Sequence, residues 1–158
     1  MTEIQLTQGK VALIDDEDYE RVSQHKWYAH KKKRSKQWYV RTKIKQKTVT
    51  LHRFILDLPK YKPLVDHIDN NGLNNQKSNL RVVTPYQNSL NRKPRTDGTS
   101  QYKGVSWHKR DKRWEVYINP KNQKRVYVGG TKCEKTAAKM YNKAAKKYFG
   151  EYAWLNPV

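Results

Sequence analysis

One asparagine-rich stretch, residues 65–88, sets the strongest limit on how this chain can fold: VDHIDNNGLNNQKSNLRVVTPYQN. Its asparagines and its glycine suit turns and are poor in helix interiors. Short apolar segments flank these turn residues, which predicts one strand ending at Asp66 and a second strand over residues 80–83. Thr84 and Pro85 then suit the cap and the first position of a helix. The stretch is therefore predicted to be a strand–loop–strand–helix unit.

The predicted unit brings Asp66, His67 and Asn88 together. A carboxylate and an amide oxygen suit a hard divalent ion, with water and a phosphate oxygen completing the coordination. His67, with an ordinary imidazole pKa of about 6.5, can take a proton from an attacking water. Asn79 is expected to tie the loop across and hold His67 in place. These residue types favour phosphodiester hydrolysis; the alternative is a polar loop in a binding protein. Neighbours on a strand point to opposite faces, so Asp66 and His67 can share a site only if the strand bends or ends there.

The charge of the chain indicates a polyanionic partner. The 158 residues include 34 Lys or Arg and 14 Asp or Glu, for a net charge of +20. Such a charge repels itself unless a polyanion neutralises it, so we expect nucleic acid, with an anionic membrane or plain solubility as alternatives. An aromatic content of 11% indicates a folded chain. The single cysteine, Cys133, excludes an internal disulfide and a cysteine-rich zinc site.

The N-terminal third is predicted to be rich in strands. Residues 3–14 alternate like a hairpin, and Asp15 or Asp16 is expected to cap a short helix. Residues 26–53 hold eleven Lys or Arg and no acid. We interpret the tract KKKRSKQ as the connection between two strands. These strands would form a two-stranded ribbon that is apolar on one face and cationic on the other. Such a ribbon fits the DNA major groove, and the alternative is a solvated face. The side chains expected to contact DNA are Lys31, Lys32, Lys33, Arg34, Arg41 and Lys43.

The C-terminal third is predicted to be a separate module. Residues 93–100 are polar and include proline and glycine, so we interpret them as a linker. Strands are expected at 102–108, 113–119 and 124–128, and a helix from about Cys133 to Phe149. Residues 101–158 hold 14 Lys or Arg against four acids, so both halves of the chain are expected to touch the polyanion.

The Asp66–His67 pair, the NLR that begins at Asn79, and Asn88 nine residues further on resemble the HNH nuclease motif, in the variant of phage intron-encoded homing endonucleases. LHRFIL at 51–56 is similar to the helix that precedes this motif. The resemblance implies the ββα-metal fold, with His67 as general base, Asn79 as the loop-fixing residue of the catalytic set, and Asp66 and Asn88 as ligands of one Mg²⁺ or Mn²⁺. Many relatives carry zinc-binding cysteine pairs, which this chain lacks, so no structural zinc is expected. Arg81, in the same NLR, is expected to contact DNA.

Residues 101–158 resemble the plant ethylene-response-factor (APETALA-type) DNA-binding domain. YKGVSWH is similar to its first strand, RVYVGG to its third, and AAKMYNKAAKKYFGEYAWLNP to its helix and tail. The resemblance implies a three-stranded antiparallel sheet packed on one helix, with the sheet in the major groove. The matching contact positions are Lys103, Gly104, Arg125, Tyr127 and Tyr141. Ser106 stands where that family usually has arginine, so its base preference does not transfer.

The sequence thus predicts an α+β chain with four parts: a β-rich, basic, DNA-contacting segment (1–50), an HNH ββα-metal nuclease unit (51–92), a linker (93–100) and an APETALA-like DNA-binding domain (101–158). We expect a site-specific DNA endonuclease of homing type that nicks one strand of duplex DNA as a monomer, with no cofactor besides the metal. The alternatives are a regulatory DNA-binding protein with a non-catalytic HNH fold and an RNA-binding module. Without a signal peptide or membrane-length apolar run, the protein is expected inside a bacterial or phage-infected cell, neither secreted nor membrane-bound.

Overall fold

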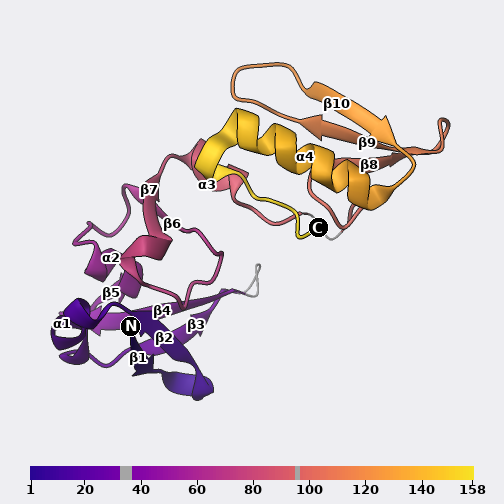
Figure 1. The fold of residues 1–158 in the computed structure, drawn as a ribbon. Helices are drawn as coiled ribbons and strands as arrows, with labels where there is room; N and C mark the ends of the chain where they lie inside the picture. Colours follow the sequence, from indigo (N-terminus) through magenta and orange to yellow (C-terminus); the bar gives the residue numbers. More distant parts are fainter. Residues whose placement is uncertain (33–36, 95–96) are drawn as a thin grey trace. The chain divides into compact units, whose positions relative to one another are not determined.

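The computed structural model describes residues 1–32, 37–94 and 97–158, which form two compact units, Met1–Pro85 and Tyr86–Val158 (Figure 1). Two predicted DNA contacts, Lys33 and Arg34, lie outside the described residues. No helix within the described residues is long and apolar enough to cross a membrane. The predicted domain boundaries at residues 50, 92 and 100 stay predictions.

The first unit is built from three small antiparallel sheets and short helices. Its elements are β1 (Thr2–Gln5), η1 (Thr7–Gly9), β2 (Val11–Ile14), η2 (Asp16–Asp18), α1 (Tyr19–Ser23), β3 (Tyr28–Lys31), β4 (Trp38–Ile44), β5 (Lys47–Thr50), α2 (Leu51–Ile55), β6 (Leu64–His67), η3 (Lys77–Asn79) and β7 (Leu80–Val83). β1 pairs with β2, β6 pairs with β7, and the third sheet has the order β3–β4–β5. The predicted N-terminal hairpin and the two strands around the asparagine-rich loop are therefore confirmed.

A single hydrophobic core joins the N-terminal segment to the strand–loop–strand segment. Its buried members are Ala12, Ile14, Val22, Trp27, Val40, Leu51, Ile55 and Leu80. The side chains come from β2, α1, β4, α2 and β7, and from the chain between α1 and β3. Because burial of apolar surface is the main stabilising term, these elements fold against one another as one body.

The predicted cationic ribbon is a sheet of three strands, with β5 as the added strand. β4 alternates as predicted, since Val40 and Thr42 are buried and Lys43 is exposed. The two residues between β4 and β5, Lys45 and Gln46, have φ angles of 46° and 63°. Two-residue hairpin turns need this left-handed conformation, for which asparagine and glycine are the usual residues. The sequence therefore held no turn signal for the third strand.

Asp15 occupies the N-cap position of η2, as predicted, but its side chain does not make the expected capping bond. Neither acid makes a side-chain capping bond with η2 or α1 in the described part of the chain. The Asp15 carboxylate instead accepts hydrogen bonds from the Lys77 backbone N–H (2.8 Å) and from the Gln76 side-chain amide (3.2 Å). Asp16 binds the N-terminal ammonium group at 2.8 Å. Asp15 therefore links the N-terminal hairpin to the residues that precede β7.

The second unit is a three-stranded antiparallel sheet with a helix on one face (Figure 1), as the sequence predicts. Its elements are α3 (Pro85–Leu90), which begins at the boundary, β8 (Val105–His108), β9 (Arg113–Ile118), β10 (Val126–Thr131), α4 (Glu134–Phe149) and η4 (Gly150–Tyr152). The strand order is β10–β9–β8. The helix α4 buries Ala137, Ala138, Tyr141 and Ala145 in the core beneath it.

The chain as a whole is a mixed α and β protein with several small antiparallel sheets and few helices. β6, β7 and α3 follow one another in the order that the ββα-metal fold requires. Since α3 extends into the second unit, the packing of that fold stays a prediction.

Substitution of Gly72 tests how tightly the asparagine-rich loop packs on β4. A Cβ atom at this position would lie 2.3 Å from the carbonyl oxygen of Trp38 and 2.9 Å from the Tyr39 ring. We predict that Gly72→Ala lowers the free energy of unfolding by roughly 1–3 kcal/mol, because the loop must move away from the backbone of β4. Urea denaturation measures the loss. Ser78→Ala, at an exposed position of the same connection, is the control and should change stability by less than about 0.5 kcal/mol. Equal stability of the two variants would contradict the packing.

Candidate functional site

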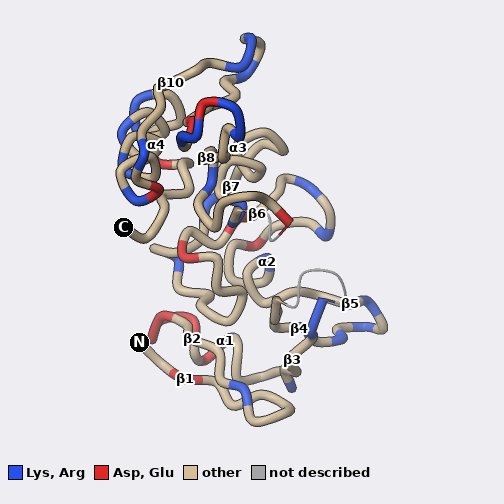
Figure 2. The backbone as a smooth tube through the Cα atoms, turned by 90° about the vertical axis from the view of Figure 1, so that its right-hand side faces the viewer, with Lys and Arg blue, Asp and Glu red and all other residues tan. Residues whose placement is uncertain are grey.

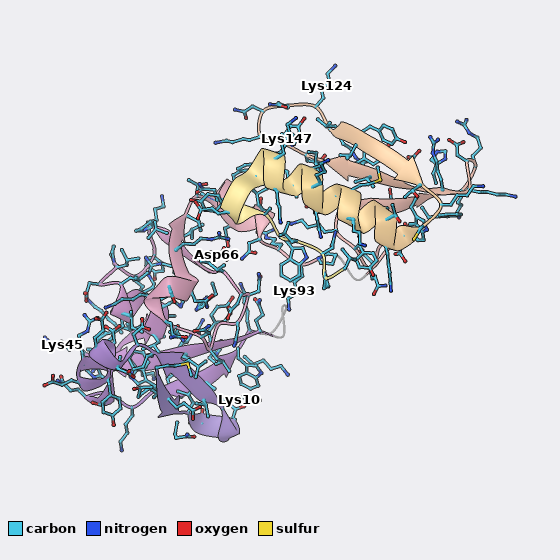
Figure 3. The ribbon with its side chains drawn as sticks, viewed as in Figure 1. Lys10, Lys45, Asp66, Lys93, Lys124 and Lys147 are labelled. Carbon is cyan, nitrogen blue, oxygen red and sulfur yellow. The ribbon has the colours of Figure 1, made fainter. Side chains whose placement is uncertain are left out.

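β6 ends at the Asp66–His67 pair, and both side chains are buried, with exposed fractions of 8% and 5%. Asp66 is labelled in Figure 3. In the β6–β7 ladder, Asp66 lies opposite Arg81 and His67 lies opposite Leu80. Because His67 is the last residue of the strand, the pair meets the condition under which consecutive residues can serve one site.

The loop after His67 is held by its own polar side chains. The Asn79 side-chain amide donates to Asp69 Oδ1 and to the Asn74 carbonyl, both at 2.9 Å, and its Oδ1 accepts from the Asp69 backbone N–H at 3.0 Å. Asp69 also accepts from the Asn71 backbone N–H (2.7 Å) and from the Asn74 amide (2.9 Å). These bonds give Asn79 the tying role that the sequence suggested, whereas a contribution of Asn79 to catalysis stays a prediction.

A second asparagine of the loop, Asn75, favours one tautomer of His67. Asn75 is fully buried, and its amide nitrogen donates to the carbonyls of Gly72 (3.5 Å) and Leu73 (3.0 Å). Its Oδ1 therefore faces the imidazole, 3.4 Å from His67 Nε2. An amide oxygen can only accept, so a hydrogen bond at this contact requires the proton on Nε2, and Nδ1 is then the basic nitrogen of the ring.

Burial keeps the His67 ring neutral. Loss of solvent lowers its pKa below the ordinary value, against the smaller opposing effects of the Asn75 bond and of Asp69 and Asp66. At neutral pH the imidazole is therefore an unprotonated base in a buried site, which is the state that proton abstraction requires.

Asp66 forms a buried ion pair with Arg81. The guanidinium donates to Asp66 Oδ2 from Nη2 at 2.9 Å and from Nε at 3.2 Å, and the two side chains are 10% and 11% exposed. The structure therefore gives Arg81, predicted to contact DNA, a structural partner. Its contact with DNA stays a prediction.

Two residues that the sequence did not assign to the site lie beside His67. The His52 ring, from α2, is 5.1 Å from the His67 ring between centroids, and the Tyr39 ring, from β4, is 6.1 Å away. No spacing in the sequence indicates this cluster, because its members come from three separate elements. Asn75 was also missed, since the sequence shows it only as one asparagine of a turn-rich run.

Asp66 fits the predicted divalent ion in its ligand chemistry. Carboxylate oxygen is a ligand type that Mg²⁺ and Mn²⁺ prefer, and Asp66 lies at a strand end next to the proposed base. The ion would have to share this carboxylate with Arg81 or displace the guanidinium. Asn88, the second predicted ligand, lies on α3 in the second unit, so its pairing with Asp66 stays a prediction.

Another group of possible ligands occurs at the β8–β9 turn, where ligand atoms of His108, Asp111 and Glu115 lie within 4.8 Å of one another. Arg113 binds both carboxylates, each at 3.1 Å. A guanidinium thus already neutralises the acids of this group, which we interpret as an ion-pair network.

Cationic residues of the first unit gather on the three-stranded sheet, whereas acids gather near β2 and α1 (Figure 2). Lys31, Lys32 and Lys43 are exposed, and Arg41 is partly exposed. Lys31 also lies over the Trp38 ring, 5.5 Å from its centroid. These four side chains are thus positioned on or beside one sheet, and their contact with DNA stays a prediction.

The predicted DNA contacts of the second unit fall into two groups. Tyr127 is 48% exposed, and the Arg125 guanidinium stacks on Tyr117 at 3.8 Å, so both side chains lie at the sheet surface. Tyr141 is 3% exposed, and burial raises its pKa to about 12. Gly104 packs against the Tyr141 ring, where a Cβ would lie 2.1 Å from a ring carbon.

Lys103 is also engaged inside the second unit. Its ammonium donates to the carbonyls of Leu90 and Arg92, and burial lowers its pKa to about 8. In the unbound protein, Lys103, Gly104 and Tyr141 therefore contribute to packing, and their predicted DNA contacts remain untested.

Comparison with known proteins gives one match along most of the chain and several over shorter stretches. An uncharacterised HNH endonuclease of Acanthamoeba polyphaga mimivirus is 34% identical over 155 residues, which cover 95% of this chain and 76% of that protein. Protein 3.8 of Escherichia phage T7 is 46% identical over 50 residues, covering 32% and 41%. An AP2-like ethylene-responsive transcription factor of Arabidopsis thaliana is 42% identical over 60 residues, covering 38% and 12%. No family model matches the chain.

The lowered pKa of His52 should make the stability of the protein depend on pH. Burial and the neighbouring His67 lower this pKa to about 3, well below the value of about 6.5 expected in the unfolded chain. As pH falls below about 6.5, the unfolded chain takes up this proton first, so stability is lost down to about pH 3. The loss for this one group approaches about 1.4 kcal/mol per pH unit.

We therefore predict that His52→Phe makes the unfolding free energy less sensitive to acid between pH 7 and pH 4. Urea denaturation followed by tryptophan fluorescence measures the unfolding free energy of both proteins at each pH. The difference between the two curves is assigned to the first unit, because the substitution lies there. Parallel pH curves for wild type and variant would contradict the low pKa.

Proposed function

Because the chain belongs to the HNH endonuclease family, we propose that it is a metal-dependent DNA endonuclease that hydrolyses a phosphodiester bond at the Asp66–His67 site. The observation that carries the proposal is the buried pair at the end of β6, with a neutral imidazole held on Asn75. The relatives imply DNA as the partner, and the net charge of +20 suits it.

In the proposed reaction, His67 takes a proton from the attacking water at Nδ1, because Nε2 already carries the proton that faces Asn75. The loop bonds of Asn79 keep the buried amide of Asn75 in place against the Nε2 edge of the ring. A base held in one orientation avoids the entropic cost of ordering it during the reaction.

Asp66 and Asn88 would hold the Mg²⁺ or Mn²⁺ ion. Such an ion supplies positive charge to the phosphate and to the leaving oxygen when it is bound. Arg81 holds the Asp66 carboxylate in a fixed position and balances its charge before the ion binds. This role accounts for a guanidinium beside a carboxylate that has to receive a second cation.

The proposed enzyme acts on one strand of a long target site. Each chain carries a single Asp66–His67 pair, which suits a monomer that leaves a nick. The cationic sheet of the first unit and the β8–β9–β10 sheet would each add contacts with duplex DNA to those of the cleavage site. An extended target of this kind suits a homing endonuclease.

A plasmid assay tests the proposal directly. Purified protein is incubated with supercoiled DNA and magnesium, with manganese, or with excess chelator. We expect conversion to the nicked circle with either metal and intact DNA with chelator, while a gel-shift assay in chelator still shows binding. Binding without cleavage under all metal conditions would favour a regulatory protein with a non-catalytic site. Full activity in excess chelator would contradict the proposed metal dependence of cleavage.

His67→Ala tests the assignment of the base. We predict a cleavage rate lower by roughly 10²–10⁴-fold, because the attacking water loses its proton acceptor. DNA affinity measured in chelator should stay within about twofold, since a buried neutral ring offers little to the phosphate backbone. His25→Ala, which removes another histidine of the first unit, is the control and should cleave normally. In the wild type the rate should rise with pH through a pKa below 6.5, and this rise should disappear in His67→Ala.

Lys31 and Lys32 test whether the cationic sheet meets DNA. We predict that changing both to glutamine lowers the affinity for all sequences alike. Each lost phosphate contact should reduce the slope of log K against log salt by about 0.9. Titrations at several salt concentrations measure the slope, with Lys60→Gln, an exposed lysine beyond α2, as the control. An unchanged slope in the double variant would place these lysines away from the DNA.

A further inference from the structure

Two aromatic rings, those of Tyr39 and His52, contact the ring of the proposed base, His67. The His52 ring stands edge-to-face on the His67 ring, with centroids 5.1 Å apart and an interplanar angle of 87°. The Tyr39 ring is 6.1 Å from His67 and 6.4 Å from His52, at angles of 64° and 65°. Each ring therefore contacts the other two in the geometry that aromatic pairs prefer.

Two of these rings come from parts of the first unit that the motif does not include. Tyr39 belongs to β4, the central strand of the N-terminal sheet, and His52 belongs to α2. The asparagine-rich loop approaches the Tyr39 ring so closely that a Cβ on Gly72 would lie 2.9 Å from it. The Tyr39 hydroxyl donates to Gln37 Oε1 at 3.1 Å, which holds the ring from its far end.

His52 is held as a neutral ring. Its Nε2 lies 3.2 Å from Thr50 Oγ1, and its Nδ1 is buried without a hydrogen-bond partner among the described residues. With a pKa lowered to about 3 by burial, the ring is uncharged wherever the enzyme would work. It can therefore act on His67 through its shape and its ring edge, and not as a second acid or base.

We propose that Tyr39 and His52 form a ring wall that sets the orientation of the His67 imidazole, so that the N-terminal sheet is part of the nuclease site. The inference rests on the proposed function, because it gives positioning residues to the proposed base. Asn75 fixes which nitrogen of His67 is basic, and the ring wall fixes the direction in which that nitrogen points.

The test compares variants that remove a ring with variants that keep one, all in the full chain. Tyr39→Leu and His52→Leu remove a ring, whereas Tyr39→Phe and His52→Phe keep it and remove its polar atoms. His25→Leu is the matched control, because His25 makes an edge-to-face contact with Phe54 at 5.3 Å in the same unit. Three quantities are measured: the cleavage rate at saturating supercoiled DNA with magnesium, the DNA dissociation constant in chelator, and the melting temperature.

We expect the two leucine variants of the ring wall to lose roughly 10- to 100-fold in maximal rate, because a small misplacement of a catalytic group has effects of this size. Their DNA dissociation constants should stay within about twofold of wild type, since neither ring is proposed to touch DNA. The phenylalanine variants should keep the rate within about threefold. His25→Leu should lower the melting temperature without this loss of rate.

A second measurement does not depend on activity. The ring protons of His67 are observed by NMR without metal or DNA, and their chemical shifts report the ring currents of their neighbours. Tyr39→Leu and His52→Leu should shift these signals, the phenylalanine variants should shift them less, and His25→Leu should leave them in place.

The possible outcomes separate this inference from the proposed function. Leucine variants that cleave at the wild-type rate, or that leave the His67 signals unmoved, would overturn the ring wall. So would a loss of rate in phenylalanine variants equal to that in leucine variants, or an equal loss of rate in His25→Leu at a similar fall in melting temperature. A wild-type protein that never cuts DNA would overturn the nuclease function, and the NMR comparison would still decide whether the Tyr39 and His52 rings lie against His67.

Discussion

The polar loop between β6 and β7 has to satisfy its own hydrogen bonds, and the first unit is arranged around that requirement. Inside the loop, asparagine and aspartate side chains pair with one another and with the backbone. From outside, β2 completes the pairing: Leu13 donates to the Leu73 carbonyl at 2.9 Å and accepts from the Asn75 N–H at 2.7 Å. A buried backbone group without a partner costs free energy comparable to a lost hydrogen bond. The N-terminal hairpin is therefore what allows Asn75, and through it His67, to stay inside the protein.

The same burial determines the electrostatics of the site. The Arg81 guanidinium pairs with the buried Asp66 carboxylate at 2.9 Å, whereas burial lowers the pKa values of His67 and His52. A buried ion pair adds little to stability compared with apolar packing. A protein with a buried neutral imidazole loses stability in acid, because the unfolded chain takes up the proton more readily. These features are poor choices for a structural core and suitable ones for a site that has to hold a carboxylate and a neutral base side by side.

The sequence predicted the parts of this arrangement that depend on local patterns. Alternating residues predicted β4, helical spacing predicted α4, and the turn-rich run between apolar segments predicted β6 and β7. It could not predict β5, because Lys45 and Gln46 adopt a left-handed turn that their residue types do not favour. Asp15 looked like a helix cap, but its partners are some sixty residues away. His52 and Tyr39 were missed for the same reason, since their approach to His67 depends on the packing of three separate elements and no local pattern records it.

The strand β4 carries two predicted DNA contacts, Arg41 and Lys43, together with the Tyr39 ring that contacts His67. Its side chains alternate between two faces, so Tyr39, Arg41 and Lys43 share the face opposite to Val40 and Thr42. Arg41 is close enough to His52 to lower the pKa of that ring, and Tyr39 contacts both histidines. A duplex that binds the cationic side chains of this face would therefore press on the same strand that orients the base. In the proposed complex the affinity for DNA and the geometry of the base would both depend on β4, although Tyr39 need not touch the DNA.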